Sequence, residues 1–114
     1  MSAGIYNFVL DQGSTWNLNI VYKDPSGTPI NLTGYTAEMQ IRETPSNNSV
    51  LTLSTGGNGI VITGSTGNIA LTATDEQTGA IDSGMYVYDL ELNIAGVRTR
   101  LIQGSVTVSA EVTQ

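Results

Sequence analysis

The sequence predicts an all-β fold, a single domain of short antiparallel strands arranged as a two-layer sandwich or a barrel. In several segments the apolar residues recur at every second position, which is the period of a strand with one buried face. Clusters rich in Gly, Asn, Asp and Pro, all typical of turns, separate these segments. The length of 114 residues fits one domain.

The strand period is visible from the start of the chain. Residues 1–10 alternate Tyr6, Phe8 and Leu10, which predicts an N-terminal arm or edge strand before a sandwich domain in residues 11–114. The segment "TWNLNIVY" places four apolar residues on one face. After the reversals "DPSG" and "NLTG", the segment "YTAEMQIRE" alternates apolar residues with polar and charged ones. Each of these two segments predicts a further strand.

The middle of the chain predicts three short strands and one helical turn. A loop, "TPSNNS", comes before the strands "VLTLS", "GIVITG" and "NIALTAT". The separators "TGGNG" and "STGN" supply residues that reach positive φ at little cost, as hairpin turns require. Next, Thr74 and Gln77 have the spacing of a capping box, and Gly79 ends the segment early. One helical turn near residues 75–80 is therefore predicted.

The last two predicted strands form a hairpin. They are "GMYVYDLELN", from Gly84 to Asn93, and a long strand from Val97 to about Val108, joined by the turn "NIAG". Gly104 in the second strand indicates either a bulge or a close approach of another backbone. The inward positions of all these strands predict a core that includes Trp16, Ile20, Tyr35, Met39, Tyr88, Leu90 and Leu92.

Composition excludes several classes of function. The chain has no Cys and no His, so it has neither thiol chemistry nor the commonest general base. Its formal net charge of −6 argues against a nucleic-acid partner, because binding phosphates needs a basic surface. No run of residues has the length of a membrane span, and no secretory signal is visible. We expect a soluble protein made in a cytoplasm.

Two carboxylates give the one candidate for acid–base chemistry. Asp89 and Glu91 lie two apart on a predicted strand, so they share a face about 7 Å apart along it. A glycosidase-like pair would need a cleft and one acid with a raised pKa. The alternative is an outward face on which Arg98 and Arg100 answer the two acids across the hairpin. We favour this second interpretation and predict no catalytic residues.

No metal or cofactor site is predicted either. Asp75, Glu76, Asp82 and Asp89 could supply oxygen ligands, but their spacing matches no calcium loop. The glycine-rich "GSTG" and "TGGNG" lack the lysine and the spacing of a phosphate-binding loop. The aromatic residues fall on inward faces, which favours a role in the core over a sugar-binding platform. No small-molecule substrate is expected.

Four segments, taken in order, resemble a known family. They are "DQGSTWNLNIVYKDPSGTPINLTGYTAEMQIRE", "GNIALTATDEQT", "SGMYVYDLEL" and "RLIQGSVTVSAEVT". Together they are similar to the small β-sandwich of bacteriophage virion proteins, notably the N-terminal domain of the baseplate upper protein family. The resemblance covers most of residues 11–113 and rests on the order and spacing of the segments.

The resemblance implies an immunoglobulin-like sandwich that acts without catalysis as an assembly module in a phage tail or baseplate. Because the sequence ends after the sandwich, a whole small subunit is expected, either a tail or baseplate adaptor or a capsid decoration protein. A carbohydrate-binding module is an alternative of another class. The location implied is the virion, after synthesis in the host bacterial cytoplasm, and the partners implied are other virion proteins and copies of the chain itself.

The expected protein contacts lie in the arm and in one loop. An arm of this kind can add a strand to an exposed sheet edge, of its own chain or of a neighbour. On this basis, we expect deletion of residues 1–10 to impair assembly more than folding. The candidate contact residues are Ile5, Tyr6, Phe8, Pro45, Asn47 and Asn48.

Overall fold

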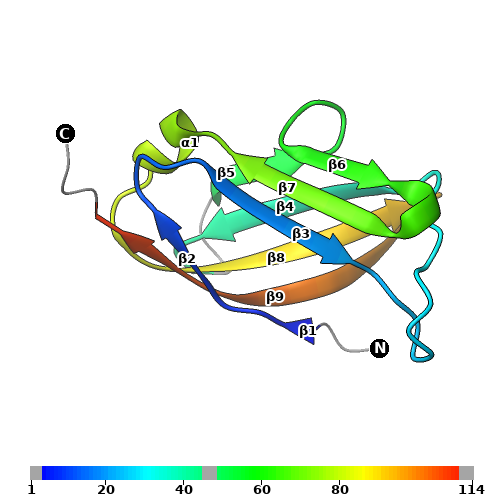
Figure 1. Ribbon diagram of the computed structural model, residues 1–114. Coiled ribbons are helices and arrows are strands. Elements are labelled where there is room, and N and C mark those ends of the chain that lie inside the picture. The colour runs from blue at the N-terminus through cyan, green and yellow to red at the C-terminus, as the bar shows by residue number, and fades with distance from the viewer. Residues whose placement is uncertain (1–3, 45–48, 111–114) are drawn as a thin grey trace.

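The computed structural model describes residues 4–44 and 49–110 and confirms an all-β sandwich of two layers (Figure 1). Six strands form the first sheet: β1 (Gly4–Ile5), β2 (Phe8–Asp11), β4 (Thr36–Arg42), β5 (Ser49–Ser54), β8 (Gly84–Ile94) and β9 (Val97–Ser109). Three form the second: β3 (Trp16–Val21), β6 (Ile60–Thr63) and β7 (Asn68–Ala73). A single 3-10 turn, η1 (Gly64–Thr66), joins β6 to β7, and a helical turn, α1 (Asp75–Gly79), leads from β7 toward β8.

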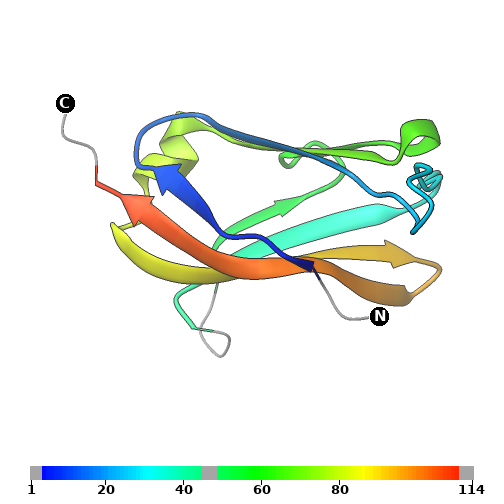
Figure 2. The same cartoon turned by 60° about the horizontal axis from the view of Figure 1, so that its bottom comes forward.

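The order of the strands is that of an immunoglobulin-like sandwich. The first sheet runs β1-β9-β8-β4-β5, with β2 also on β9, and the second runs β3-β7-β6. In immunoglobulin folds one sheet likewise holds strands C, F and G, here β4, β8 and β9, and the other holds B, E and D, here β3, β7 and β6. Figure 2 shows the two layers from the side. Within the part of the chain that the structure describes, no helix is long and apolar enough to cross a membrane.

The hydrophobic core lies between the layers. Met39, Leu90 and Leu92 are fully buried, as the alternation in their strands predicts, and Tyr88 is nearly so. The other predicted core residues, Trp16, Ile20 and Tyr35, are partly buried and pack against the same cluster. Trp16 and Ile20 belong to β3, which is an edge strand of the smaller sheet, so one flank of the strand stays open to solvent.

The N-terminal arm is built into the first sheet. β1 and β2 pair with β9 in parallel, with Phe8 opposite Val106 and Leu10 opposite Val108. The other paired strands of the described residues are antiparallel, whereas the arm and β9 run in the same direction. The side chain of Leu10 is completely buried in the core. The arm therefore packs into the core of its own chain, and its deletion should impair folding as well as any assembly.

The predicted β8–β9 hairpin turn and the predicted capping box both form. In the β8–β9 hairpin, Ala95 and Gly96 both have positive φ, 50° and 84°, as a two-residue primed turn demands. The capping box also forms: Thr74 Oγ1 accepts from the backbone of Gln77, and Gln77 Oε1 accepts from the backbone of Thr74. The helical turn predicted near residues 75–80 is therefore present as α1.

Gly104 marks a close approach of backbone and not a bulge. The register of β8 and β9 shifts between Leu90 and Glu91, where Leu101 is the extra residue. Gly104 pairs in register with Tyr88, and a Cβ on it would collide with the carbonyl oxygen of Tyr6. Of the two alternatives left open by the sequence, the structure shows the second: the arm passes too close to β9 for any side chain at position 104.

A tyrosine corner lies at the start of β8, and it was not predicted from the sequence. The hydroxyl of Tyr86 donates to the backbone carbonyl of Asp82 at 2.7 Å, which ties the start of β8 to the preceding loop. In immunoglobulin sandwiches a tyrosine at this point lies two residues before a core cysteine. Here Tyr88 occupies that second position. The segment "DSGMYVY" therefore carries a usable signal for this fold.

We expect Tyr86→Phe to lower the free energy of unfolding by about 0.5–1.5 kcal/mol, because the variant loses one hydrogen bond and keeps the ring. Tyr35→Phe is the matched control, since its ring packs against the core while its hydroxyl makes no hydrogen bond within the described residues. Urea denaturation followed by circular dichroism measures both. Equal changes in the two variants would show that the corner does not stabilise this sandwich.

Candidate protein-contact surface

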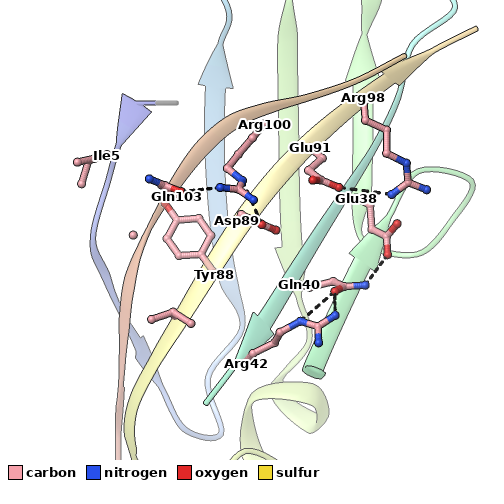
Figure 3. A pocket seen from close by; sticks show the side chains of 12 residues that line it. Ile5, Glu38, Gln40, Arg42, Tyr88, Asp89, Glu91, Arg98, Arg100 and Gln103 are labelled. Atoms are coloured by element: carbon pink, nitrogen blue, oxygen red, sulfur yellow. Dashed lines mark hydrogen bonds and ion pairs between the residues drawn. The ribbon is translucent and has the colours of Figure 1, made fainter. Parts of the chain in front are cut away.

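A groove of about 690 Å³ lies on the outer face of the first sheet, the side that points away from the second sheet (Figure 3). Its walls come from four elements: β1, β4, β8 and β9. Because side chains alternate along a strand, every second residue of β4 and β8 points here while the residues between them fill the core. The outward side chains that define the groove are Ile5, Glu38, Gln40, Arg42, Val87, Asp89, Glu91, Arg98, Arg100 and Gln103.

Charges of both signs meet in this groove. Arg98 Nη1 lies 3.5 Å from Glu91 Oε1, and Arg100 Nε lies 3.4 Å from Asp89 Oδ2. The prediction that Arg98 and Arg100 answer the two acids across the hairpin is confirmed. Asp89 and Glu91 point outward into solvent between arginines, on the face opposite the buried Tyr88 and Leu90 (Figure 3).

A second network lies along β4. Gln40 Nε2 donates to Glu38 Oε1 at 2.8 Å, and Arg42 donates to Gln40 Oε1 through both Nε and Nη2. Gln103 Oε1 in turn accepts from Arg100 Nη1 at 3.2 Å. Hydrogen bonds and ion pairs therefore link most polar groups of the groove to each other. Such a surface is preorganised for contact with another polar surface.

Ile5 belongs to this groove. Its side chain is 76% exposed and lines the edge of the groove formed by the arm. Tyr6 is also exposed, but its backbone is fixed: its N–H donates to Gln103 O at 3.0 Å, and its carbonyl accepts from the Tyr88 hydroxyl at 2.5 Å. Both residues are accessible to a partner.

Phe8 lies differently from the other arm residues. Its ring stacks on Trp16 of β3 with centroids 4.7 Å apart, and it meets Tyr88 edge-on at 4.8 Å. Phe8 thus joins the two sheets within its own chain. Three other candidate contact residues, Pro45, Asn47 and Asn48, lie outside the described residues.

Tyr86 and Tyr88 of β8 make the free energy of unfolding depend on pH in the alkaline range. The pKa of the Tyr88 phenol is raised well above its ordinary value, chiefly by burial and secondarily by the neighbouring Tyr6. The pKa of Tyr86 is also raised, chiefly by burial and then by the negative charges of Asp82 and Glu43. Because these folded-state pKa values exceed the unfolded value of about 10, the neutral phenols stabilise the fold fully below about pH 10. This contribution is lost as the pH rises above that value.

We therefore expect the free energy of unfolding to fall as the pH increases beyond about 10. Tyr88→Phe should make this fall shallower, because the variant has no phenol to ionise at that site. Denaturant unfolding between about pH 8 and pH 11, with tyrosinate absorbance as a second readout, measures the effect. An identical pH dependence in wild type and variant would contradict the assignment.

Two other kinds of site can be compared with the described residues: a metal site and an aromatic platform that binds a sugar. In residues 4–44 and 49–110, no group of three or more acidic side chains is arranged to hold a metal ion. Among those same residues, Tyr88 is the only aromatic one that lines the groove, and its side chain is buried. Tyr86 is buried as well, and Trp16, Tyr22 and Tyr35 pack against the core.

No protein-family model matches the chain, and no curated protein matches it in sequence.

The groove as a whole was not predicted from the sequence. Asp89, Glu91, Arg98 and Arg100 were identified, but the contribution of β4 through its outward residues was not. The signal was present in "YTAEMQIRE", whose outward positions carry both charges and an amide. What the sequence does not show is that β4 lies next to β8, which comes much later in the chain.

Proposed function

We propose that this chain is a non-enzymatic structural protein of a phage virion, a small tail or baseplate subunit that works through protein–protein contacts. The observation that carries the proposal is the exposed outer face of the first sheet, a broad surface of paired charges and amides backed by a continuous core. The sequence resemblance to phage β-sandwich modules supplies the virion as its location.

The chemistry of the groove supports contact more than catalysis. Asp89 and Glu91 in the groove are paired with arginines of the neighbouring strand, and no residue of the chain offers imidazole or thiol for acid–base or nucleophilic steps. Salt-linked side chains on a rigid sheet suit an interface, because their geometry is set before the partner arrives. We propose other virion proteins and copies of this chain as partners, with synthesis in the host cytoplasm.

Fractionation of phage particles tests this function. Particles purified from a lysate by density gradient should contain the chain in fixed stoichiometry to the major tail proteins, as measured by mass spectrometry. Tail and capsid fractions prepared separately then distinguish a tail subunit from a capsid decoration protein. Recovery of the chain only among the soluble proteins of the lysate would overturn the proposal.

A further inference from the structure

We propose that Asn58 is a site of spontaneous deamidation, in which the backbone nitrogen of Gly59 displaces the side-chain amide, and that the folded turn controls the rate of this reaction. The modification is independent of the virion role proposed above. Three observations carry it: the Asn58–Gly59 dipeptide, the steric requirement for glycine at position 59, and the hydrogen bonds that hold both residues in the turn.

Asn58 is the only asparagine of the sequence that is followed by glycine. An asparagine deamidates when the backbone nitrogen of the next residue attacks its Cγ, and a side chain on that next residue hinders the attack. Glycine has no Cβ, and it reaches backbone conformations that other residues avoid. The other asparagines precede larger residues, as Asn68 precedes Ile69. Asn58 is therefore the asparagine with the highest intrinsic reactivity.

The fold requires glycine at position 59. Gly59 has a φ of +95°, which side chains rarely adopt, and a Cβ on it would lie 2.7 Å from both Leu53 Cδ2 and Thr72 O. Leu53 is fully buried, and Thr72 O belongs to the backbone of β7, so Thr72 O can move aside only if the second sheet is disturbed. The packing of the sandwich thus keeps the reactive pair in place.

Hydrogen bonds hold both residues in the turn between β5 and β6, where the chain passes from the first sheet to the second (Figure 1). Asn58 Nδ2 donates to Ser54 Oγ at 3.0 Å and to Thr52 O at 3.4 Å. The carbonyl of Asn58 accepts from Ser54 N at 2.9 Å, and that of Gly59 accepts from Thr72 N at 2.8 Å. Because Nδ2 is the group that leaves, its hydrogen bonds are lost in the reaction.

The reaction therefore proceeds through local opening of this turn. The side chain of Asn58 is exposed, and a Cβ on Gly56 or on Gly57 would meet nothing within 4 Å. A segment with so few contacts can open without unfolding the core, and water reaches it freely. The deamidation rate of the folded protein should equal the rate of the unfolded chain multiplied by the fraction of time that the turn is open.

The reaction consumes one water and releases one ammonia. The bond from Gly59 N to Asn58 Cγ forms as the bond from Cγ to Nδ2 breaks, and the proton of the Gly59 amide leaves with the ammonia. Water then opens the cyclic imide. Attack at Cγ gives aspartate, whereas attack at the backbone carbonyl carbon gives isoaspartate, whose chain continues through the former side chain. Each product adds one negative charge to the formal net charge of −6.

Both products weaken the connection between the two sheets. A carboxylate at position 58 cannot donate to Thr52 O, which Asn58 Nδ2 approaches. Isoaspartate also lengthens the backbone by one methylene group. The hydrogen bonds from Ser54 N to the carbonyl at position 58 and from Thr72 N to Gly59 O then cannot both keep their geometry. The amide of Thr72 should therefore exchange faster in the modified protein.

Tandem mass spectrometry of the full chain, incubated between about pH 7 and about pH 9 where tyrosines stay neutral, tests the proposal. In urea, Asn58 should deamidate at least about tenfold faster than Asn68, because Gly59 leaves its nitrogen open to attack. In the folded protein, Asn58 should react at least about tenfold more slowly than in urea. Ser54→Ala should accelerate the folded reaction and leave the reaction in urea unchanged, because it frees Asn58 Nδ2.

Ser49→Ala is the matched control, because it removes a hydroxyl of the same strand that contacts Thr52 Oγ1 and not Asn58. Circular dichroism verifies the fold of each variant, and the comparison of folded and urea-treated wild type needs no variant at all. Asn68 reacting as fast as Asn58 in urea would overturn the assignment of the site. Equal rates for Asn58 with and without urea, or a folded Ser54→Ala no faster than Ser49→Ala, would overturn control by the turn.

Discussion

Leu10→Ala is expected to lower the free energy of unfolding by about 2–5 kcal/mol, the largest effect of any single change proposed for this protein. The side chain of Leu10 is completely buried, although it lies in the first ten residues of the chain. Its loss removes apolar surface from the core and leaves a cavity beside Val108, its neighbour on β9. The arm is thus a structural strand and not merely a flexible tether for a partner.

Val9→Ala is the matched control for this experiment. Val9 directly precedes Leu10 on the same strand, but its side chain is 58% exposed on the outer face. Its truncation should change the free energy of unfolding by no more than about 0.5 kcal/mol. Urea denaturation of both variants gives the comparison, and a Leu10→Ala protein as stable as Val9→Ala would show that the arm does not belong to the core.

Gly104→Ala is expected to cost about 1–3 kcal/mol by pushing the arm away from β9. A Cβ at this position would overlap Tyr6 O and lie 2.6 Å from Asn7 Oδ1, which itself accepts from the backbone of Ser105. The new methyl group can be accommodated only if the segment from β1 to β2 moves. When this segment moves, the hydrogen bond from the Tyr88 hydroxyl to Tyr6 O should be lost.

Amide hydrogen exchange locates this change. The N–H of Tyr6, which donates to Gln103 O, should exchange faster in Gly104→Ala, whereas the amides of β7 in the other sheet should keep their relative protection. Ser105→Ala is the control. The backbone N–H of Ser105 donates to Asn7 Oδ1, and the variant keeps this hydrogen bond. Unchanged protection of Tyr6 in Gly104→Ala would show that the arm does not pass close to β9 at this point.

Much of the fold could be predicted because its signals are local. The alternation in "TAEMQIR" and "GMYVYDLELN" indicated both the strands and their buried faces, and the turn "NIAG" was predicted from its place between two strand segments. The pairing of Asp89 and Glu91 with the arginines followed from that same hairpin. In each case the partners lie within about twenty residues, so the turn between them fixes the register.

The remaining features depend on contacts between distant segments. Alternation placed Tyr6, Phe8 and Leu10 on one face, but the arm breaks between β1 and β2, so Tyr6 is exposed while Phe8 and Leu10 point inward. Gly104 allowed two interpretations because its neighbour, Tyr6, comes from the other end of the sequence. The groove likewise requires β4 beside β8, a sheet order that no single segment encodes.

Direct imaging of the chain in a phage particle is the most direct test of the proposed function. A particle map at a resolution that traces strands should show the sandwich in the tail or baseplate, with the outer face of β4, β8 and β9 covered by a neighbouring subunit and residues 4–11 on β9 of their own chain. A particle without the chain would contradict the proposed function. A particle in which the sandwich is present and this face is open to solvent would contradict the proposed contact surface.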